Sequence, residues 1–301
     1  MNGRSAGKRT DFKGLLHGSF GVKMKLDRVS ERVYANTDGE TGGNVGIILL
    51  GEGVAAVDAQ YPVSGEDFRC SISAVTERPV THLLLTHYHG DHVLGAKAFE
   101  DCEIVAHRLL KEKMEENLRT VWAPSNLGSL IEEVRKTRPE RAPLYEGLRI
   151  VLPTKTFDDH FTLDGVEMTH TGGHTAGSSV VYVAEDRVLF AGDLIFAERF
   201  PWAGDPSADP DVWIEAFRAL LDMDVETIVP GHGPLCDRSE IRTQLEWFEA
   251  VRDEMGRLII EGASAEEAVG YDGYPTFYES EQPERRDNSL RHWYQIWSER
   301  R

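Results

Sequence analysis

The sequence lacks the features that would tie the chain to a membrane or to an oxidising compartment. No apolar run in its 301 residues approaches the ~20 residues that a membrane-spanning helix needs. Residues 1–24 are polar and glycine-rich without a continuous apolar centre, which predicts a flexible lead-in and no secretory signal. Cysteine is scarce: Cys70, Cys102 and Cys236 are odd in number and have no metal-type spacing. We therefore expect reduced cysteines, a cytoplasmic location and no membrane partner.

Positive charge is also in short supply. The chain carries 33 basic and 51 acidic residues, which gives a formal net charge of -18. So acidic a surface repels phosphate backbones, and a nucleic-acid partner is not expected. Hydrophobic residues make up 41% of the chain, enough for one large core with an appendage.

Three histidines and an aspartate are concentrated in one short motif at residues 86–92, Thr-His-Tyr-His-Gly-Asp-His. The motif directly follows the apolar run 83–85, which is typical of a buried strand that ends in a loop. In an extended segment His87 and His89 point to the same side, and Gly90 allows a turn that brings Asp91 and His92 towards them. Imidazole and carboxylate groups are good ligands for zinc and similar ions, so the motif predicts a metal site.

The same order, a strand followed by glycine and then a ligand-type residue, recurs further along the chain. His174 follows two glycines, Asp193 follows Ala-Gly, and His232 lies in Pro-Gly-His-Gly. Each of these residues is a weak signal alone, because a single Gly-Asp or Pro-Gly-His-Gly is usually a plain turn. Loops at strand ends are places where a rigid sheet can present such groups together, so we expect one shared site.

Helix signals lie between these motifs. Residues 64–67 resemble a capping box that would start a helix, and Asp209 before Pro210 predicts another that continues to Met223. An amphipathic stretch over about 108–142 reads as an insertion of the kind that often covers an active site. Residues 237–301 predict a C-terminal helical extension whose aromatic residues dock it onto the body of the protein or onto a second subunit.

Taken together, the motifs resemble those of the metallo-β-lactamase superfamily, in the family's order, from about Val33 to Leu235. The resemblance implies an α/β fold, a four-layer αββα sandwich, for a catalytic domain over residues 25–236. It implies that His87, His89 and His174 bind a first metal ion, that Asp91, His92 and His232 bind a second, and that Asp193 bridges both. A bridging aspartate at this position is similar to that of the glyoxalase II-like branch and of other hydrolases of the superfamily, whereas the β-lactamases proper generally lack it.

The resemblance further implies a binuclear hydrolase with two divalent ions per chain, zinc first and iron or manganese as alternatives. A metal-bridging hydroxide would attack a small-molecule ester, thioester or lactone, with Asp91 orienting it and β-lactams as a side activity. Two alternatives stay open. One is a mononuclear iron enzyme similar to the persulfide dioxygenases, which would use His87, His174 and Asp193, and the other is a metal-binding module without catalysis.

Residues beside the expected ligands are candidates for a substrate pocket. Phe196, Arg199, Phe200 and Trp202 follow Asp193 closely, and Trp122 in the insertion is a candidate lid residue. Ordinary packing is an equal alternative for the aromatic residues after Asp193, and a surface position is an alternative for the arginine. The hydroxyls of Thr86 and Thr175 are candidates for hydrogen bonds that orient ligands, with a simple turn role as the alternative. A homodimer is left open.

Overall fold

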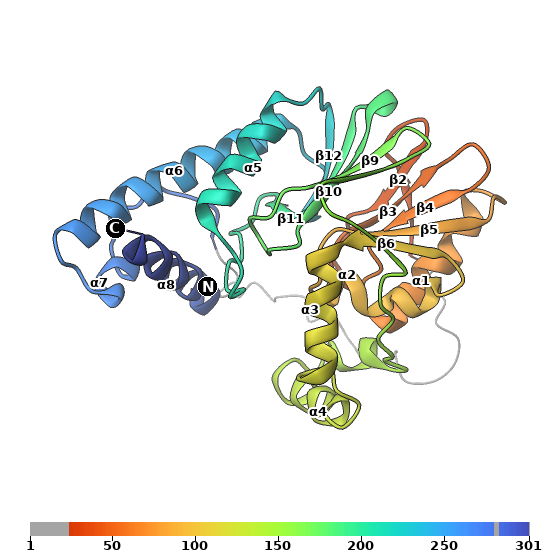
Figure 1. Cartoon of the computed structure of the whole chain (residues 1–301), viewed down its shortest axis with the longest axis horizontal. Coiled ribbons are helices and arrows are strands. Elements are labelled where there is room, and N and C mark those ends of the chain that lie inside the picture. The colour runs from red at the N-terminus through yellow and green to blue at the C-terminus, as the bar shows by residue number, and fades with distance from the viewer. Residues whose placement is uncertain (1–23, 280–282, 301) are drawn as a thin grey trace, which may run out of the picture.

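The computed structural model describes residues 24–279 and 283–300, so the predicted lead-in over 1–24 lies outside the described residues except for its last position. Two β-sheets form the centre of the molecule (Figure 1), with seven strands in the order β1-β2-β3-β4-β5-β6-β7 and five in the order β12-β11-β10-β9-β8. The first sheet comprises β1 (Asp27–Arg28), β2 (Val33–Asn36), β3 (Val45–Leu49), β4 (Val54–Val57), β5 (Val80–Leu85), β6 (Glu103–His107) and β7 (Lys155–Phe157). The second comprises β8 (His160–Leu163), β9 (Val166–His170), β10 (Ser179–Val183), β11 (Val188–Phe196) and β12 (Thr227–His232).

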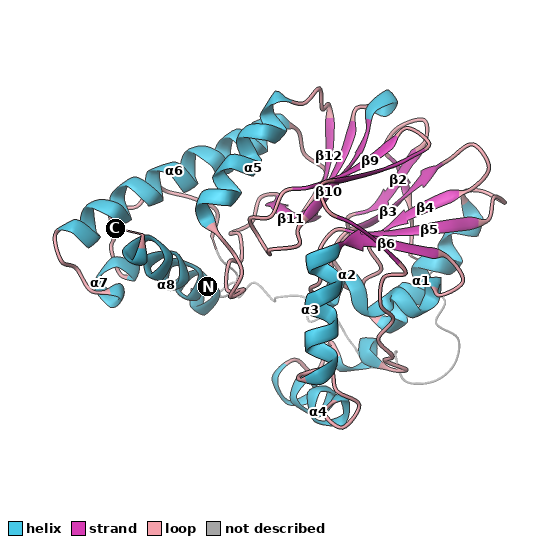
Figure 2. Ribbon diagram, viewed as in Figure 1, coloured by secondary structure: helices cyan, strands magenta, loops and turns pink. Residues whose placement is uncertain are grey.

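Helices cover the outer faces of the two sheets (Figure 2). Those that precede the second sheet in the chain are α1 (Pro62–Ser71), η2 (Ile72–Ala74), α2 (Gly90–Val93), η3 (Leu94–Phe99), α3 (Arg108–Arg119), α4 (Leu127–Thr137) and η4 (Ala142–Tyr145). Those that lie within or after it are η5 (Ala184–Asp186), α5 (Pro210–Asp222), α6 (Arg238–Ile260), α7 (Ala265–Val269) and α8 (Pro283–Glu299). Among the described helices, none is both long enough and apolar enough to cross a bilayer.

The layers follow from the alternation of side chains along the strands. On β5, Leu84 points into a core between the two sheets, where it joins residues such as Val181 of β10. Its neighbours Leu83 and Leu85 point to the opposite face and pack against the helices that include α1 and α3. A third core lies between the five-stranded sheet and α5, α6 and α8. The order helix, sheet, sheet, helix is therefore the predicted αββα sandwich.

The C-terminal helices belong to this third core. Trp293 and Trp297 of α8 are 0% and 5% exposed and pack in the same cluster as Phe248 of α6. Trp293 and Phe248 have their ring centroids 4.7 Å apart. As predicted, aromatic residues of the tail dock the extension onto the body of the protein, and α8 runs beside α6 in Figure 1.

Helix starts agree with the predicted signals in one case and differ in another. Asp209 caps α5 by accepting hydrogen bonds from the backbone N–H groups of Asp211 and Val212. The helix ends at Asp222, one residue before the predicted end. The predicted capping box at residues 64–67 is wrong, because α1 already begins at Pro62. Proline at the first helical position has a fixed φ and no N–H to leave unpaired, so it can start the helix without a capping side chain. Ser64 instead donates a hydrogen bond to the backbone carbonyl of Tyr61.

Candidate metal centre

Strand ends and the loops after them deliver all seven candidate ligands to one edge of the two sheets. The segment after β5 carries the 87–92 motif, of which Asp91 and His92 lie on the short helix α2. His174 comes from the loop between β9 and β10, while Asp193 lies within β11 and His232 ends β12. The seven side chains fall into two groups, each with its ligand atoms within 4.8 Å of one another: His87, His89, His174 and Asp193 in the first, and Asp91, His92 and His232 in the second.

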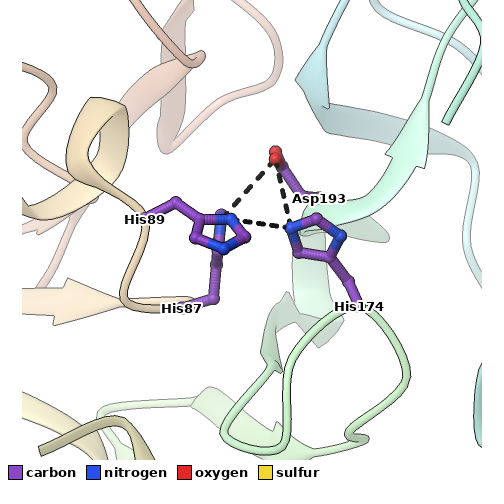
Figure 3. A group of neighbouring side chains, drawn as sticks. All are labelled: His87, His89, His174 and Asp193. Atoms are coloured by element: carbon purple, nitrogen blue, oxygen red, sulfur yellow. Dashed lines mark hydrogen bonds and ion pairs between the residues drawn. The ribbon is translucent and has the colours of Figure 1, made fainter. Parts of the chain in front are cut away.

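In the first group three imidazoles and a carboxylate converge on a common point (Figure 3). Nε2 of His174 lies 2.9 Å from Nδ1 of His89. Nε2 of His87 and Nε2 of His174 each lie 3.5 Å from Oδ2 of Asp193. The convergence of so many nitrogen and oxygen atoms is the arrangement that a tetrahedral cation site requires.

The second group lies on the other side of the same aspartate. Nε2 of His232 is 3.4 Å from Oδ2 of Asp91 and 3.5 Å from Oδ1 of Asp193. Nε2 of His92 is 3.1 Å from Oδ1 of Asp193. The two carboxylate oxygens of Asp193 are thus divided, with Oδ2 facing the first group and Oδ1 facing the second.

Glycine is required where the backbone passes close to these side chains. A Cβ atom at Gly231 would lie 2.0 Å from Oδ1 of Asp193, and one at Gly43 would lie 2.3 Å from the ring of His92. Gly192, directly before Asp193, has φ of +51°, a conformation that glycine adopts without strain. The glycines that mark the motifs in the sequence therefore make room for the site.

Asp58 orients two of the histidines, although its role was not predicted from the sequence. Its Oδ2 accepts hydrogen bonds from Nδ1 of His92 at 2.8 Å and from the hydroxyl of Thr86 at 2.8 Å. The Thr86 oxygen lies 3.1 Å from Nδ1 of His87 and can accept a hydrogen bond from it. Both histidines then present the lone pair of Nε2 to the site. Of the two threonines considered from the sequence, Thr86 has the orienting contact, whereas Thr175 pairs with Ser178.

Asp205 orients His89 in the same way, and its role was also not predicted from the sequence. Its Oδ2 lies 3.1 Å from Nε2 of His89 and accepts a hydrogen bond from the hydroxyl of Tyr88. Nδ1 of His89 is therefore left to face His174. The Asp205 side chain is 2% exposed, and no motif in the sequence marks it. Asp58 did carry a signal, because a carboxylate that directly follows the buried strand β4 is unusual unless it has a partner.

The titratable groups of the site act strongly on one another. Although burial opposes it, the histidines around Asp193, first among them His232, hold the pKa of that carboxyl well below its usual range. Burial likewise opposes ionisation of His232, yet Asp193 and Asp91 raise its pKa to about 9. Burial, with His92 second, lowers the pKa of His87 to about 4. The two carboxylates thus stay anionic, and His87 stays neutral.

The donor set fits divalent metal ions. Nε2 of His87, Nε2 of His92 and Oδ1 of Asp193 are buried and have no hydrogen-bond partner among the described residues. Buried polar atoms are normally paired, and these three point into the same space. Nε2 of His92 lies 3.1 Å from Oδ1 of Asp193, close enough for one positive charge, a proton or a metal ion, to lie between the two atoms.

A cavity of about 410 Å³ opens directly over the candidate ligands His89, Asp91, Asp193 and His232, which form part of its lining. The predicted pocket residues Phe196, Arg199, Phe200 and Trp202 all line it as well. The ring of Phe196 stacks on His232 with centroids 5.5 Å apart, and that of Trp202 meets His89 at 5.0 Å.

Trp122 is placed elsewhere. It is 7% exposed, packs in the core beneath the seven-stranded sheet and does not line the cavity. The structure therefore does not support the lid role that we expected for this residue. Its indole is large and apolar, and the loop after α3 folds it inward onto that core. The end of the insertion nevertheless reaches the cavity through Arg138 and Arg141.

Comparison with known proteins agrees with this fold and site. The family model of the metallo-β-lactamase superfamily matches residues 38–232, and the chain belongs to that superfamily.

Two curated relatives and one solved structure show which proteins the chain is similar to. A linear primary-alkylsulfatase from Pseudomonas sp. is 26% identical over 74% of this chain and 47% of its own length. A hydroxyacylglutathione hydrolase from Rhizobium meliloti is 29% identical over 54% of this chain and 56% of its own length. The structure of a sec-alkylsulfatase from Pseudomonas sp. has a TM-score of 0.69 at 14% identity, covering 91% of this chain and 50% of that one. The matches thus span about half the length of these relatives, and the low identity of the solved structure speaks for the fold alone.

Proposed function

We propose that this protein is a hydrolase that holds two divalent metal ions, zinc in the first place, and cleaves a small-molecule ester, thioester or lactone. The observation that carries the proposal is the division of the Asp193 carboxylate, whose Oδ2 faces one complete group of histidines and whose Oδ1 faces the other. Seven candidate ligands are more than one zinc ion takes, whereas two ions can share a carboxylate. The alkylsulfatase and hydroxyacylglutathione hydrolase among the relatives support hydrolysis as the reaction class.

Metal ions at such a centre lower the pKa of water and polarise the bond under attack. The chain's own residues would position the reactants. Asp91 lies at the edge of the cavity, and one of its carboxylate oxygens faces His232 at 3.4 Å. In this proposal its other oxygen accepts a hydrogen bond from the attacking water and so orients it. Phe196 and Trp202 would pack against the apolar part of the substrate and exclude bulk water.

The two alternatives predict different chemistry. An iron dioxygenase would need only His87, His174 and Asp193, and would leave the second group without a role. A binding module without catalysis would need no cavity over the candidate ligands, yet one is present. The three cysteines are free, which suits a reducing compartment such as the cytoplasm, and we keep that location as part of the proposal.

Elemental analysis of the purified protein, followed by assays on lactones, thioesters, esters and β-lactams, tests the proposal. We expect two divalent ions per chain and hydrolysis of an ester-type substrate. Asp91→Asn should lower kcat by at least about 100-fold because the attacking water is no longer oriented. One iron per chain with oxygen consumption and no hydrolysis would establish the dioxygenase alternative in its place.

A further inference from the structure

Besides Arg199, three arginines from distant parts of the chain line the cavity above the candidate metal centre. Arg138 directly follows α4, Arg141 directly precedes η4, and Arg285 lies in the first turn of α8. The helical insertion and the C-terminal extension thus each contribute positive charge to the same cavity. In a chain with a net charge of -18, a concentration of this kind needs a reason.

None of the three forms an ion pair with a carboxylate of the described residues. Among those residues, the guanidinium of Arg141 donates one hydrogen bond, to the hydroxyl of Tyr61 at 3.3 Å. The guanidinium of Arg285 lies over the ring of Trp202, with Cζ 6.0 Å from the ring centroid. Arginines elsewhere do find carboxylates, as in the pairs Arg149–Glu100, Arg187–Asp224 and Arg257–Glu254.

The charged form of Arg285, which is half-buried, is disfavoured by this arrangement. Burial, followed by repulsion from Arg138 and Arg141, lowers its pKa from the usual value. Asp91 attracts both Arg285 and Arg141, but it also faces His232 of the candidate metal centre.

Two further carboxylates line the cavity at exposed positions, whereas the buried Asp193 faces the histidines of the candidate metal centre. Glu198 and Glu279 both line the cavity, and neither is among the groups that most affect Arg285. Glu198 instead raises the pKa values of Cys236 and Tyr278, which do not line the cavity. Two of the three arginines therefore share Asp91 as a counter-charge, and Asp91 also faces His232, so a bound anion would relieve repulsion that this one carboxylate does not neutralise.

We propose that Arg138, Arg141 and Arg285 form an oxyanion subsite, and that the substrate of this enzyme carries an anionic group which these arginines hold. The planar guanidinium groups match the geometry of carboxylate and sulfate and bind them through paired hydrogen bonds. That the bound anionic group belongs to the substrate rests on the proposed hydrolase function. The subsite itself rests only on the arginines. A cavity of about 410 Å³ has room for a small organic anion beside the candidate metal centre.

Calorimetric titration of the metal-loaded protein with glutarate and, separately, with sulfate tests the subsite without any need for turnover. We expect at least one of the two anions to bind, and Arg141→Gln and Arg285→Gln to weaken that binding about 10- to 100-fold. The two titrations also tell whether the subsite prefers a carboxylate or a sulfate. Arg141→Lys and Arg285→Lys should recover part of the affinity, because charge is retained while the paired hydrogen bonds are lost.

Arg135→Gln provides the matched control. Arg135 lies on α4 only three residues before Arg138 but is exposed and paired with Glu132, so its replacement should leave anion binding at the wild-type level. Metal content is measured for every variant, which separates a lost subsite from a lost metal centre. Failure of both anions to bind, or wild-type affinity in Arg141→Gln and Arg285→Gln, would overturn the proposal.

A pair of esters links the subsite to the substrate. The ratio of kcat/KM for the p-nitrophenyl monoester of glutaric acid to that for p-nitrophenyl acetate should fall at least about tenfold in Arg285→Gln. An unchanged ratio would refute the selection of anionic substrates. If no ester, thioester or lactone of the panel is hydrolysed while the arginines still bind the anion, the hydrolase proposal is contradicted and the subsite stands.

Discussion

Oδ2 of Asp205 lies 3.1 Å from Nε2 of His89, on the opposite side of the imidazole from the candidate metal centre. The hydrogen bond fixes the ring so that Nδ1 points towards His174, and burial of the carboxylate keeps water from competing for it. The neighbouring residues Tyr88 and His89 thus both hydrogen-bond to Asp205, which lies in a loop more than a hundred residues further along the chain.

Asp205→Asn should therefore weaken metal binding and lower activity together, each by about 10- to 100-fold, because the imidazole loses its orienting carboxylate. Competition with a chelator measures the metal affinity. Asp224→Asn, which removes a surface carboxylate paired with Arg187, is the control and should behave as the wild type. Wild-type metal affinity in Asp205→Asn would mean that the other ligands hold His89 in place without it.

Asp193→Ala should lose more metal than replacement of a ligand in either group alone. His232→Ala removes one ligand of the second group and should leave the first ion bound, whereas Asp193→Ala removes an oxygen from both groups. Elemental analysis after dialysis should give about one ion per chain for His232→Ala and less than one for Asp193→Ala. Two ions and full activity in Asp193→Ala would show that this residue does not bridge.

The candidate ligands could be predicted from the sequence because each stands in a short local pattern of strand, glycine and ligand. The physical reason for the pattern is visible at Gly231, where any Cβ would collide with Asp193. Such a constraint acts between chain neighbours and strands in contact, so it leaves a trace at fixed positions. The layers were predicted through the family resemblance, and the structure agrees, because side chains of the strands alternate between two apolar cores.

What could not be predicted depends on contacts between distant segments. Asp205 meets His89, and Arg285 meets the end of the insertion, only after the chain has folded, and neither has a local pattern. Trp122 shows the opposite error: an aromatic residue in an insertion fits a lid or a core equally well, and burial of its apolar surface decided for the core.

Gly231→Ala should damage the site while preserving the fold. The added methyl would lie 2.0 Å from Oδ1 of Asp193 and 2.6 and 2.7 Å from backbone atoms of Gly192 and Asp193, so the carboxylate and the backbone that carries it must shift. We expect lower metal content and at least about a tenfold loss of kcat, since a displacement near 1 Å is enough for that. Circular dichroism and metal analysis give the two readouts.

Gly128→Ala is the matched control for that substitution. Gly128 lies on α4 with nothing within 4 Å of an added Cβ, and alanine there should stabilise the helix by up to about 1 kcal/mol without affecting metal content. If Gly231→Ala bound two ions as tightly as Gly128→Ala, the close approach at Gly231 would not matter to the site.

Away from the metal centre, His107 predicts a pH dependence of stability. Its ring stacks on that of His170 with centroids 3.8 Å apart, and its Nδ1 accepts a hydrogen bond from the backbone of Leu109. Burial, followed by the neighbouring His170, lowers the pKa of His107 to about 4. The folded protein thus holds His107 neutral, whereas the unfolded chain takes up a proton near pH 6.5.

The free energy of unfolding should consequently fall as the pH drops from about 6.5 towards 4, and His107→Asn should remove part of that fall, on the order of 1 kcal/mol. Asparagine keeps an acceptor for the Leu109 N–H but does not titrate. Urea denaturation at pH 7.5 and pH 4.5 measures the difference, and His160→Asn, at an exposed position on β8, should keep the wild-type dependence. If His107→Asn lost as much stability on acidification as the wild type, protonation of His107 would not be the cause, and other buried groups would have to supply it.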